Sequence, residues 1–122
     1  MPGDAMLEDK AKEVGRLIGQ SAEYQAVKRA NDSLQEDRAA LALLKKMEEL
    51  RLEAQRMIES GERPTEEMEG ELDGLLGKVQ MNGAYQQVVV AQENFEKIMG
   101  RVNEWITEGI RKGATSSIIT LG

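Results

Sequence analysis

The feature that most constrains the fold of this chain is a long helical pattern between Gly83 and Lys112. No proline interrupts the segment, and it contains three of the four aromatic residues of the chain. At about 3.6 residues per turn, one apolar stripe runs along the predicted helix through Tyr85, Val88, Phe95, Met99, Val102 and Ile106. A second apolar line follows its flank at seven-residue spacing, through Ala84, Ala91, Ile98 and Trp105.

The two lines together cover roughly half of the helix circumference, more than the ~100° stripe that one core contact requires. We therefore expect the helix at 83–112 to touch two neighbours, and another chain is a candidate for one of them. The flank residues Ala91, Ile98 and Trp105 are candidate interface residues. Leu41 and Leu52, which lie off the apolar stripe of a second long helix, are candidate residues of a second contact surface.

Composition favours helices over sheets. Hydrophobic residues make up 40% of the 122 residues, but aromatic residues only 3%. A core of aliphatic side chains and methionine suits helix packing, whereas strands favour β-branched and aromatic residues. The two prolines, Pro2 and Pro64, leave long uninterrupted tracts between them. A chain of this length is expected to form one domain.

Four further segments repeat apolar residues at spacings of three and four. They predict helices at about 5–19, 22–34, 38–60 and 66–80. Residue types that cap helix N-termini stand near their starts, namely Asp4, Ser21, Asp37 and Thr65. Gly61 marks a helix end, and Asn82-Gly83 marks a turn.

The predicted fold class is all-α, an antiparallel helical bundle in a single domain over residues 1–122. The two long helices, 38–60 and 83–112, are expected to pack antiparallel through the hairpin-like helix at 66–80, while the N-terminal helices close the core. The pattern stops at Gly113, and residues 113–122 are predicted to form a flexible tail. Docking of its apolar residues onto a groove or a partner is the alternative; these are Ile118, Ile119 and Leu121.

Neither cysteine nor histidine occurs in the sequence. Disulfides, thiolate zinc sites, cysteine-ligated iron–sulfur clusters and imidazole bases are therefore excluded. The sequence has no glycine-rich phosphate loop, and Ser116 and Ser117 have no histidine to activate them. We expect no enzyme activity, no catalytic residue and no cofactor.

One segment concentrates acidic side chains. Residues 62–73 include six acidic residues against one basic residue, Arg63. Paired carboxylates can bind Mg²⁺ or Ca²⁺, or share acid–base chemistry. The segment lacks the alternating Asp and Asn ligands of an EF-hand, and a solvated helix face is the simpler interpretation. We therefore predict no metal site.

The formal net charge is −6, with 16 basic and 22 acidic residues. Phosphate binding needs clustered Lys and Arg, so direct nucleic-acid binding is not expected. No apolar run approaches the ~20 residues of a membrane span, and the N-terminus has no secretory signal. A cytoplasmic protein without membrane insertion is predicted.

Several weak features follow one another in a recognisable order. An apolar pair leads to a serine and an aromatic residue, and a small residue follows; these are Leu17, Ile18, Ser21, Tyr24 and Ala30. A Gly-x-x-x-Thr link comes next, at Gly61 and Thr65. The last feature is an Asn-led helix with the pattern Y…AQ..F, formed by Asn82, Tyr85, Ala91, Gln92 and Phe95. Over residues 7–110 this order resembles the YlbF/YmcA family of small bacterial helical proteins.

The resemblance implies an all-helical, oligomerising cytoplasmic protein with a role in the control of competence, sporulation and biofilm formation. Family members form complexes with one another and with a partner protein, and act as a specificity factor for a membrane-associated ribonuclease in mRNA processing. Those complexes have been associated with iron–sulfur clusters held by cysteines. Cluster binding does not carry over to this chain, because it has no cysteine.

We therefore expect a non-enzymatic regulatory or adaptor protein that acts through helix-mediated oligomerisation. Its expected partners are further copies of the chain, sister family proteins and a ribonuclease. The alternative is a direct RNA-binding helical protein, which the net negative charge disfavours.

Overall fold

The computed structural model of the protein describes the backbone of residues 2–121 and the side chains of residues 3–115. The described part consists of five helices joined by short links, and no strand occurs in it. The helices are α1 (Pro2–Gly19), α2 (Ala22–Glu36), α3 (Arg38–Glu59), α4 (Glu66–Met81) and α5 (Gly83–Leu121). The predicted all-α class is confirmed.

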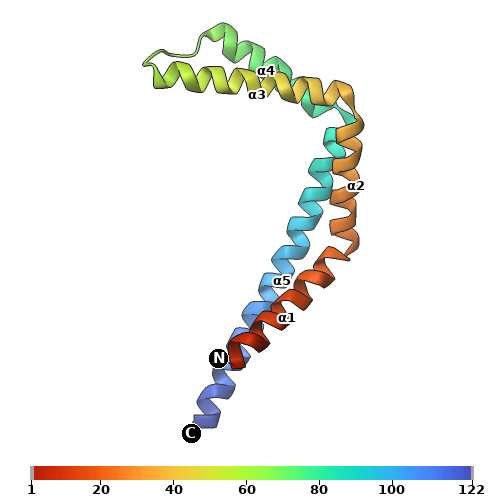
Figure 1. Ribbon diagram of the computed structural model, residues 1–122, viewed down its shortest axis with the longest axis vertical. Helices are drawn as coiled ribbons and strands as arrows, with labels where there is room; N and C mark the ends of the chain where they lie inside the picture. Colours follow the sequence, from red (N-terminus) through yellow and green to blue (C-terminus); the bar gives the residue numbers. More distant parts are fainter. Residues whose placement is uncertain (1, 122) are drawn as a thin grey trace.

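The helices form two antiparallel pairs that meet at a bend (Figure 1). α2 packs against α5, and this pair is called the stalk. α3 packs against α4, and this pair is called the arm. α1 contacts the start of α2 and runs beside the C-terminal half of α5 (Figure 1). The two long helices were expected to pack antiparallel against each other, and this prediction was wrong. α3 packs mainly against the shorter α4, and α5 packs mainly against the shorter α2.

The stalk has a core of small residues. Ala30 of α2 is buried together with Val88 and Ala91 of α5. Alanine at these positions lets the two helix axes approach closely. One turn further along, the rings of Tyr24 and Phe95 lie 5.7 Å apart in a tilted arrangement, which aromatic pairs favour. The arm buries Ala40 of α3 and two residues of α4, Leu75 and Val79.

Three of the predicted caps are confirmed by their hydrogen bonds. The side chain of Ser21 accepts from the Tyr24 N–H at 3.1 Å, and that of Thr65 accepts from the Met68 N–H at 3.1 Å. Asp37 Oδ1 accepts from the Ala40 N–H at 2.9 Å. Asp4 is not a cap, because α1 already begins at Pro2 and Asp4 lies within its first turn.

The end of α3 follows the Schellman pattern. Gly61 adopts a φ of 83°, and the Glu62 N–H donates to the Met57 carbonyl at 2.8 Å. Glycine takes this left-handed conformation without strain. By contrast, α5 continues through Gly113 to Leu121, so its predicted end at Lys112 was wrong. A helical glycine costs about 1 kcal/mol relative to alanine but does not by itself end a helix.

The predicted flexibility of residues 113–122 stays a prediction. The side chains of Ile118, Ile119 and Leu121 lie outside the described residues. The single-domain boundary over residues 1–122 also stays a prediction.

Two helix caps meet at the bend between arm and stalk. Asp37 caps α3, while Asn82 Oδ1 accepts from the Tyr85 N–H at 3.0 Å and so caps α5. The Asn82 amide donates to Asp37 Oδ2 at 3.3 Å. Both carboxylate oxygens of Asp37 are thus used, one within its own helix start and one across the bend. The Ala40 N–H and then the Asn82 amide hold the pKa of Asp37 below its ordinary value of 3.8.

The lowered pKa predicts how the bend responds to acid. The ionised carboxylate of Asp37 contributes its full stabilisation at pH values above its pKa in the unfolded chain. That stabilisation is lost as the pH falls through its lower pKa in the folded protein. Asp37→Asn keeps a capping oxygen but turns a second N–H toward the Asn82 amide, so it should melt at a lower temperature than wild type at pH 7. The gap in melting temperature should close toward pH 3, as followed by circular dichroism.

A matched control for this measurement is Thr65→Ala, which removes an uncharged cap away from the bend. It should cost about 1 kcal/mol at both pH values. A gap between Asp37→Asn and wild type that stays constant from pH 7 to pH 3 would contradict the role assigned to Asp37.

The outer face of α4 offers a second stability test. Gly74 lies in mid-helix, and no heavy atom of the described structure outside its own backbone surroundings lies within 4 Å of where a Cβ would stand. Gly74→Ala should therefore raise the free energy of unfolding by roughly 0.5–1 kcal/mol. Gly61→Ala is the matched control and should lower it, because Gly61 has a φ of +83°. Urea titration measures both, and a destabilised Gly74→Ala would contradict the prediction.

Candidate interaction surface

The chain exposes far more surface than a compact protein of its mass. Its solvent-accessible surface is 9717 Å². A compact monomer of 13.5 kDa is expected to expose about 6,500 Å². The excess of roughly 3,200 Å² follows from the two-helix thickness of both stalk and arm, because a pair of helices covers only one side of each partner.

Much of the exposed surface near the chain termini is apolar. On α1, Leu7 is 69% exposed and Leu17 is 55% exposed. On the facing half of α5, Trp105 is 57% exposed and Ile110 is 64% exposed. A large apolar side chain gains about 1.5–3 kcal/mol when it moves from water to a fully buried position. Burying these side chains against another apolar surface would therefore be favourable.

A groove of about 460 Å³ separates α1 from the C-terminal half of α5. It is called the α1–α5 groove. Seven of its eight lining residues are apolar, and Ser21 is the polar exception. Its walls consist of Val14, Leu17, Ile18 and Ser21 on the α1 side, and Ile98, Val102, Trp105 and Ile106 on α5. The apolar stripe of α1 thus faces an open space instead of a packed core.

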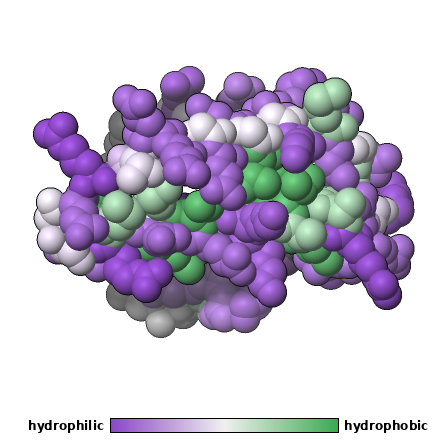
Figure 2. Space-filling model, turned by 90° about the horizontal axis from the view of Figure 1, so that it is seen from above, coloured by the Kyte–Doolittle hydropathy of each residue, from purple (hydrophilic) through white to green (hydrophobic). Residues whose placement is uncertain are grey.

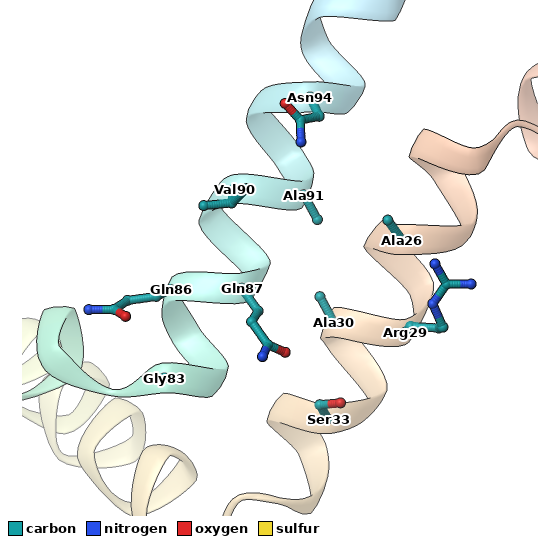
Figure 3. A pocket seen from close by; sticks show the side chains of 10 residues that line it. All are labelled: Ala26, Arg29, Ala30, Ser33, Gly83, Gln86, Gln87, Val90, Ala91 and Asn94. Atoms are coloured by element: carbon teal, nitrogen blue, oxygen red, sulfur yellow. The ribbon is translucent and has the colours of Figure 1, made fainter.

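Further along the stalk lies a more polar hollow of about 590 Å³ (Figure 3). Ala26 and Ala30 of α2 point toward Ala91 of α5 across its floor. Longer polar side chains surround this floor, namely Arg29, Ser33, Gln86, Gln87 and Asn94. The alanine floor, with hydrogen-bonding side chains around it, forms a surface that another helix could approach closely.

A third hollow, of about 370 Å³, connects the other two. It shares Ala26 and Asn94 with the polar hollow and Ile98 with the α1–α5 groove. The three hollows therefore follow one another along the stalk, and together they are called the trough. This trough changes from polar near the bend to apolar near the termini.

The structure places three of the five predicted interface residues along this trough. Ala91 lies in the floor of the polar hollow, Ile98 lies at the junction, and Trp105 lines the α1–α5 groove. Ala91 is only 6% exposed, since it also packs within the stalk. Their seven-residue spacing on one helix explains why they share a side.

The other two predicted interface residues lie on the arm. Leu41 is partly buried, and Leu52 is 49% exposed, three turns further along the same face of α3. Figure 2 views the molecule from above the arm and shows a green apolar band between purple hydrophilic side chains. The arm therefore adds a second exposed apolar face, separate from the trough.

Sequence reasoning missed the α1 wall of the groove. The spacing of Leu7, Val14 and Ile18 correctly indicated an apolar helix face, but that face was assigned to a closed core. The spacing of apolar residues shows that a helix has an apolar face. It does not show whether another helix of the same chain covers that face. The α2 side of the floor of the polar hollow, formed by Ala26 and Ala30, was also missed, because alanine gives little signal in an apolar pattern.

The acidic segment 62–73 forms no site in the described structure. All six acidic side chains are exposed, five of them on α4 and Glu62 in the link before it. Within the described residues, no group of three or more Asp, Glu, His or Cys side chains lies close enough to hold a metal ion. Nor does any described helix combine the length and apolar character needed to cross a membrane.

Comparison with known proteins gives a consistent family assignment. The UPF0342 protein of Streptococcus mutans is 31% identical over 70% of this chain and 75% of its own length. That of Alkalihalophilus pseudofirmus is 28% identical over 85% of this chain and 88% of its own. That of Leuconostoc mesenteroides is 24% identical over 84% and 87%, respectively.

The model of one protein family matches residues 7–111 of this chain, nearly the span over which the sequence resembles that family. The family is described as "Control of competence regulator ComK, YlbF/YmcA". The match includes α2, α3 and α4 completely, most of α1 and the helical part of α5 that lines the trough. The chain belongs to the YlbF/YmcA family, a family of regulatory proteins.

Proposed function

We propose that this regulator is a non-catalytic adaptor that acts by binding helical surfaces of other proteins. The observation that carries the proposal is the apolar surface left open on the stalk, together with exposed leucine on the arm. A surface excess of roughly 3,200 Å² is several times the ~800 Å² that one partner buries in a standard interface. One chain therefore has room for more than one partner at a time.

The two exposed faces have different characters, which supports two separate roles. The trough runs along the stalk and ends in the apolar α1–α5 groove. The arm instead presents single leucines, Leu41 and Leu52, among charged residues. We assign self-association to the stalk, and contact with a sister family protein or a ribonuclease of mRNA processing to the arm. The resemblance of the sequence to regulators of that process motivates the second assignment.

Catalysis is not part of the proposal. The three hollows of the stalk are lined mainly by aliphatic, amide and charged surface residues, and the proposal assigns none of them a catalytic role. Binding of RNA by the chain itself is also left out, because the acidic balance of 22 to 16 works against phosphate contacts.

The test is affinity purification of the tagged chain from its own cells after nuclease treatment, with mass spectrometry as the readout. Recovery of a sister family protein or a ribonuclease is expected. Leu52→Asp should lower that recovery at least roughly fivefold, as loss of a ~1 kcal/mol contact requires. Gln55→Asp is the matched control, since it adds the same charge one turn away without removing an apolar side chain.

Recovery of the tagged chain alone, or equal recovery with Leu52→Asp and wild type, would contradict the adaptor role of the arm. Circular dichroism of both variants should match wild type, because both positions are exposed. This measurement confirms that a change in recovery arises from the surface and not from unfolding.

A further inference from the structure

We infer that Asn82 is a deamidation site that the bend between stalk and arm controls. The closed bend keeps the Asn82 side chain away from the reaction, and the product of the reaction loosens the bend. The inference concerns a covalent change within the chain and goes beyond the proposed adaptor function.

The first argument is the residue that follows Asn82. The side-chain amide of an asparagine is open to attack by the backbone nitrogen of the next residue, which closes an imide ring. Of the four asparagines in the sequence, Asn82 alone is followed by glycine. Gly83 has no Cβ to obstruct the attack. As the first residue of α5, it also has a backbone N–H for which its own helix provides no acceptor.

The reaction needs no reagent other than water. The Gly83 nitrogen forms a bond to the Asn82 Cγ, the bond between Cγ and Nδ2 breaks, and the proton of the Gly83 nitrogen leaves with Nδ2 as ammonia. Water then opens the imide on one of its two sides. Attack at Cγ leaves aspartate at this position, and attack at the backbone carbonyl carbon leaves isoaspartate, in which the main chain runs through the side chain. The net change replaces an amide NH₂ group by a hydroxyl group, without oxidation or reduction.

The second argument is the way in which the folded bend holds Asn82. Its Oδ1 accepts from the Tyr85 N–H at 3.0 Å, and its amide donates to Asp37 Oδ2 at 3.3 Å. The backbone at Asn82 is extended, with a φ of −73° and a ψ of 127°. This ψ turns the Gly83 nitrogen away from the Asn82 Cβ, whereas the imide ring requires the two atoms side by side. The closed bend therefore slows the attack.

The third argument is how lightly the bend is closed. α2 gives way to α3, and α4 to α5, at the same bend, each across one non-helical residue (Figure 1). These two residues, Asp37 and Asn82, are only partly buried, and the neighbouring Met81 is 83% exposed. Their N···O distance of 3.3 Å exceeds the usual ~2.9–3.0 Å. Local opening costs little free energy where few apolar contacts are lost, so a fraction of the molecules release the Asn82 side chain at equilibrium.

The product changes the chemistry of the bend. With aspartate in place of Asn82, the amide donor is gone and a second carboxylate faces that of Asp37, so the two charges repel each other. Isoaspartate adds a methylene group to the main chain, which displaces the capping oxygen from the Tyr85 N–H. Either product therefore removes the hydrogen bond that joins stalk and arm. The loss of ammonia makes the change one-way.

The test follows deamidation in the purified full-length chain over days at physiological temperature and neutral pH. Peptide mapping by mass spectrometry measures the modified fraction at each asparagine. Asn82 should react faster than Asn31, Asn94 and Asn103, which are internal controls in the same sample. Fragmentation that distinguishes aspartate from isoaspartate should find both products at Asn82.

Three variants separate the control by the bend from general stability. Asp37→Ala removes the acceptor of the Asn82 amide and should raise the deamidation rate at Asn82 at least roughly fivefold. Thr65→Ala also removes a helix cap but lies away from the bend, so it should leave that rate unchanged. Gly83→Ala should lower the rate, because its Cβ obstructs the attack. Apart from its chain neighbours and its own helix backbone, no heavy atom of the described structure lies within 4 Å of that Cβ, so this variant should fold normally.

Asn82→Asp imitates one product directly. Small-angle X-ray scattering should show a broader distribution of interatomic distances than for wild type, because the arm takes more orientations relative to the stalk. Asn103→Asp is the matched control, since it adds the same charge at an exposed position of α5, and it should leave the scattering unchanged. Circular dichroism of both variants should keep the helical signal, which separates a loosened bend from unfolding.

Three results would overturn the inference: deamidation at Asn82 no faster than at Asn103, equal rates at Asn82 in Asp37→Ala and in wild type, or scattering of Asn82→Asp that matches wild type. Each of them is separate from the adaptor test, which depends on Leu52 of the arm and measures recovery of a partner.

Discussion

The hydrogen bond between the Asn82 amide and the Asp37 carboxylate joins the two places where the chain passes between stalk and arm. Each of these residues also caps the helix that follows it, Asp37 at the start of α3 and Asn82 at the start of α5. Both passages between stalk and arm therefore lie at the same place in the molecule, and the two helix pairs leave it in different directions (Figure 1).

A bend at this point has a direct consequence for the hydrophobic surface. Had α3 folded back along α5, the apolar stripes of all five helices would have met in one core. Instead, each half of the molecule is only two helices thick, and its helices keep apolar sides that no part of the described chain covers. The core of the stalk is formed by small residues such as Ala30 and Ala91, which bury little area. Covering the exposed apolar faces with a bound partner would therefore also stabilise the fold.

This arrangement suits a regulator. The hollows on the stalk become more apolar from the bend toward the chain termini, and the arm exposes separate leucine side chains. Membership of the YlbF/YmcA family places this surface within a regulatory protein, and the lack of cysteine separates the chain from any cysteine-ligated cluster chemistry.

Local features of the sequence predicted much of the secondary structure. Caps at Ser21, Asp37 and Thr65 and the helix end at Gly61 depend on residues within a few positions of one another, so their side chains identify them. The seven-residue spacing of Ala91, Ile98 and Trp105 likewise determined that they share one side of a helix. The end of α5 was missed because Gly113 is compatible with both a helix and a stop.

The pairing of the helices depended on tertiary structure. The sequence showed that α1, α3 and α5 each have an apolar face, and many pairings satisfy such faces equally well. In the folded chain the backbone turns at Asp37, where φ is −88° and ψ is 99°, and that residue contacts Asn82, 45 positions away. The sequence by itself therefore determined where helices form and which sides are apolar, because these follow from local geometry. Only the tertiary structure decided which apolar sides meet inside the chain and which remain open to a partner.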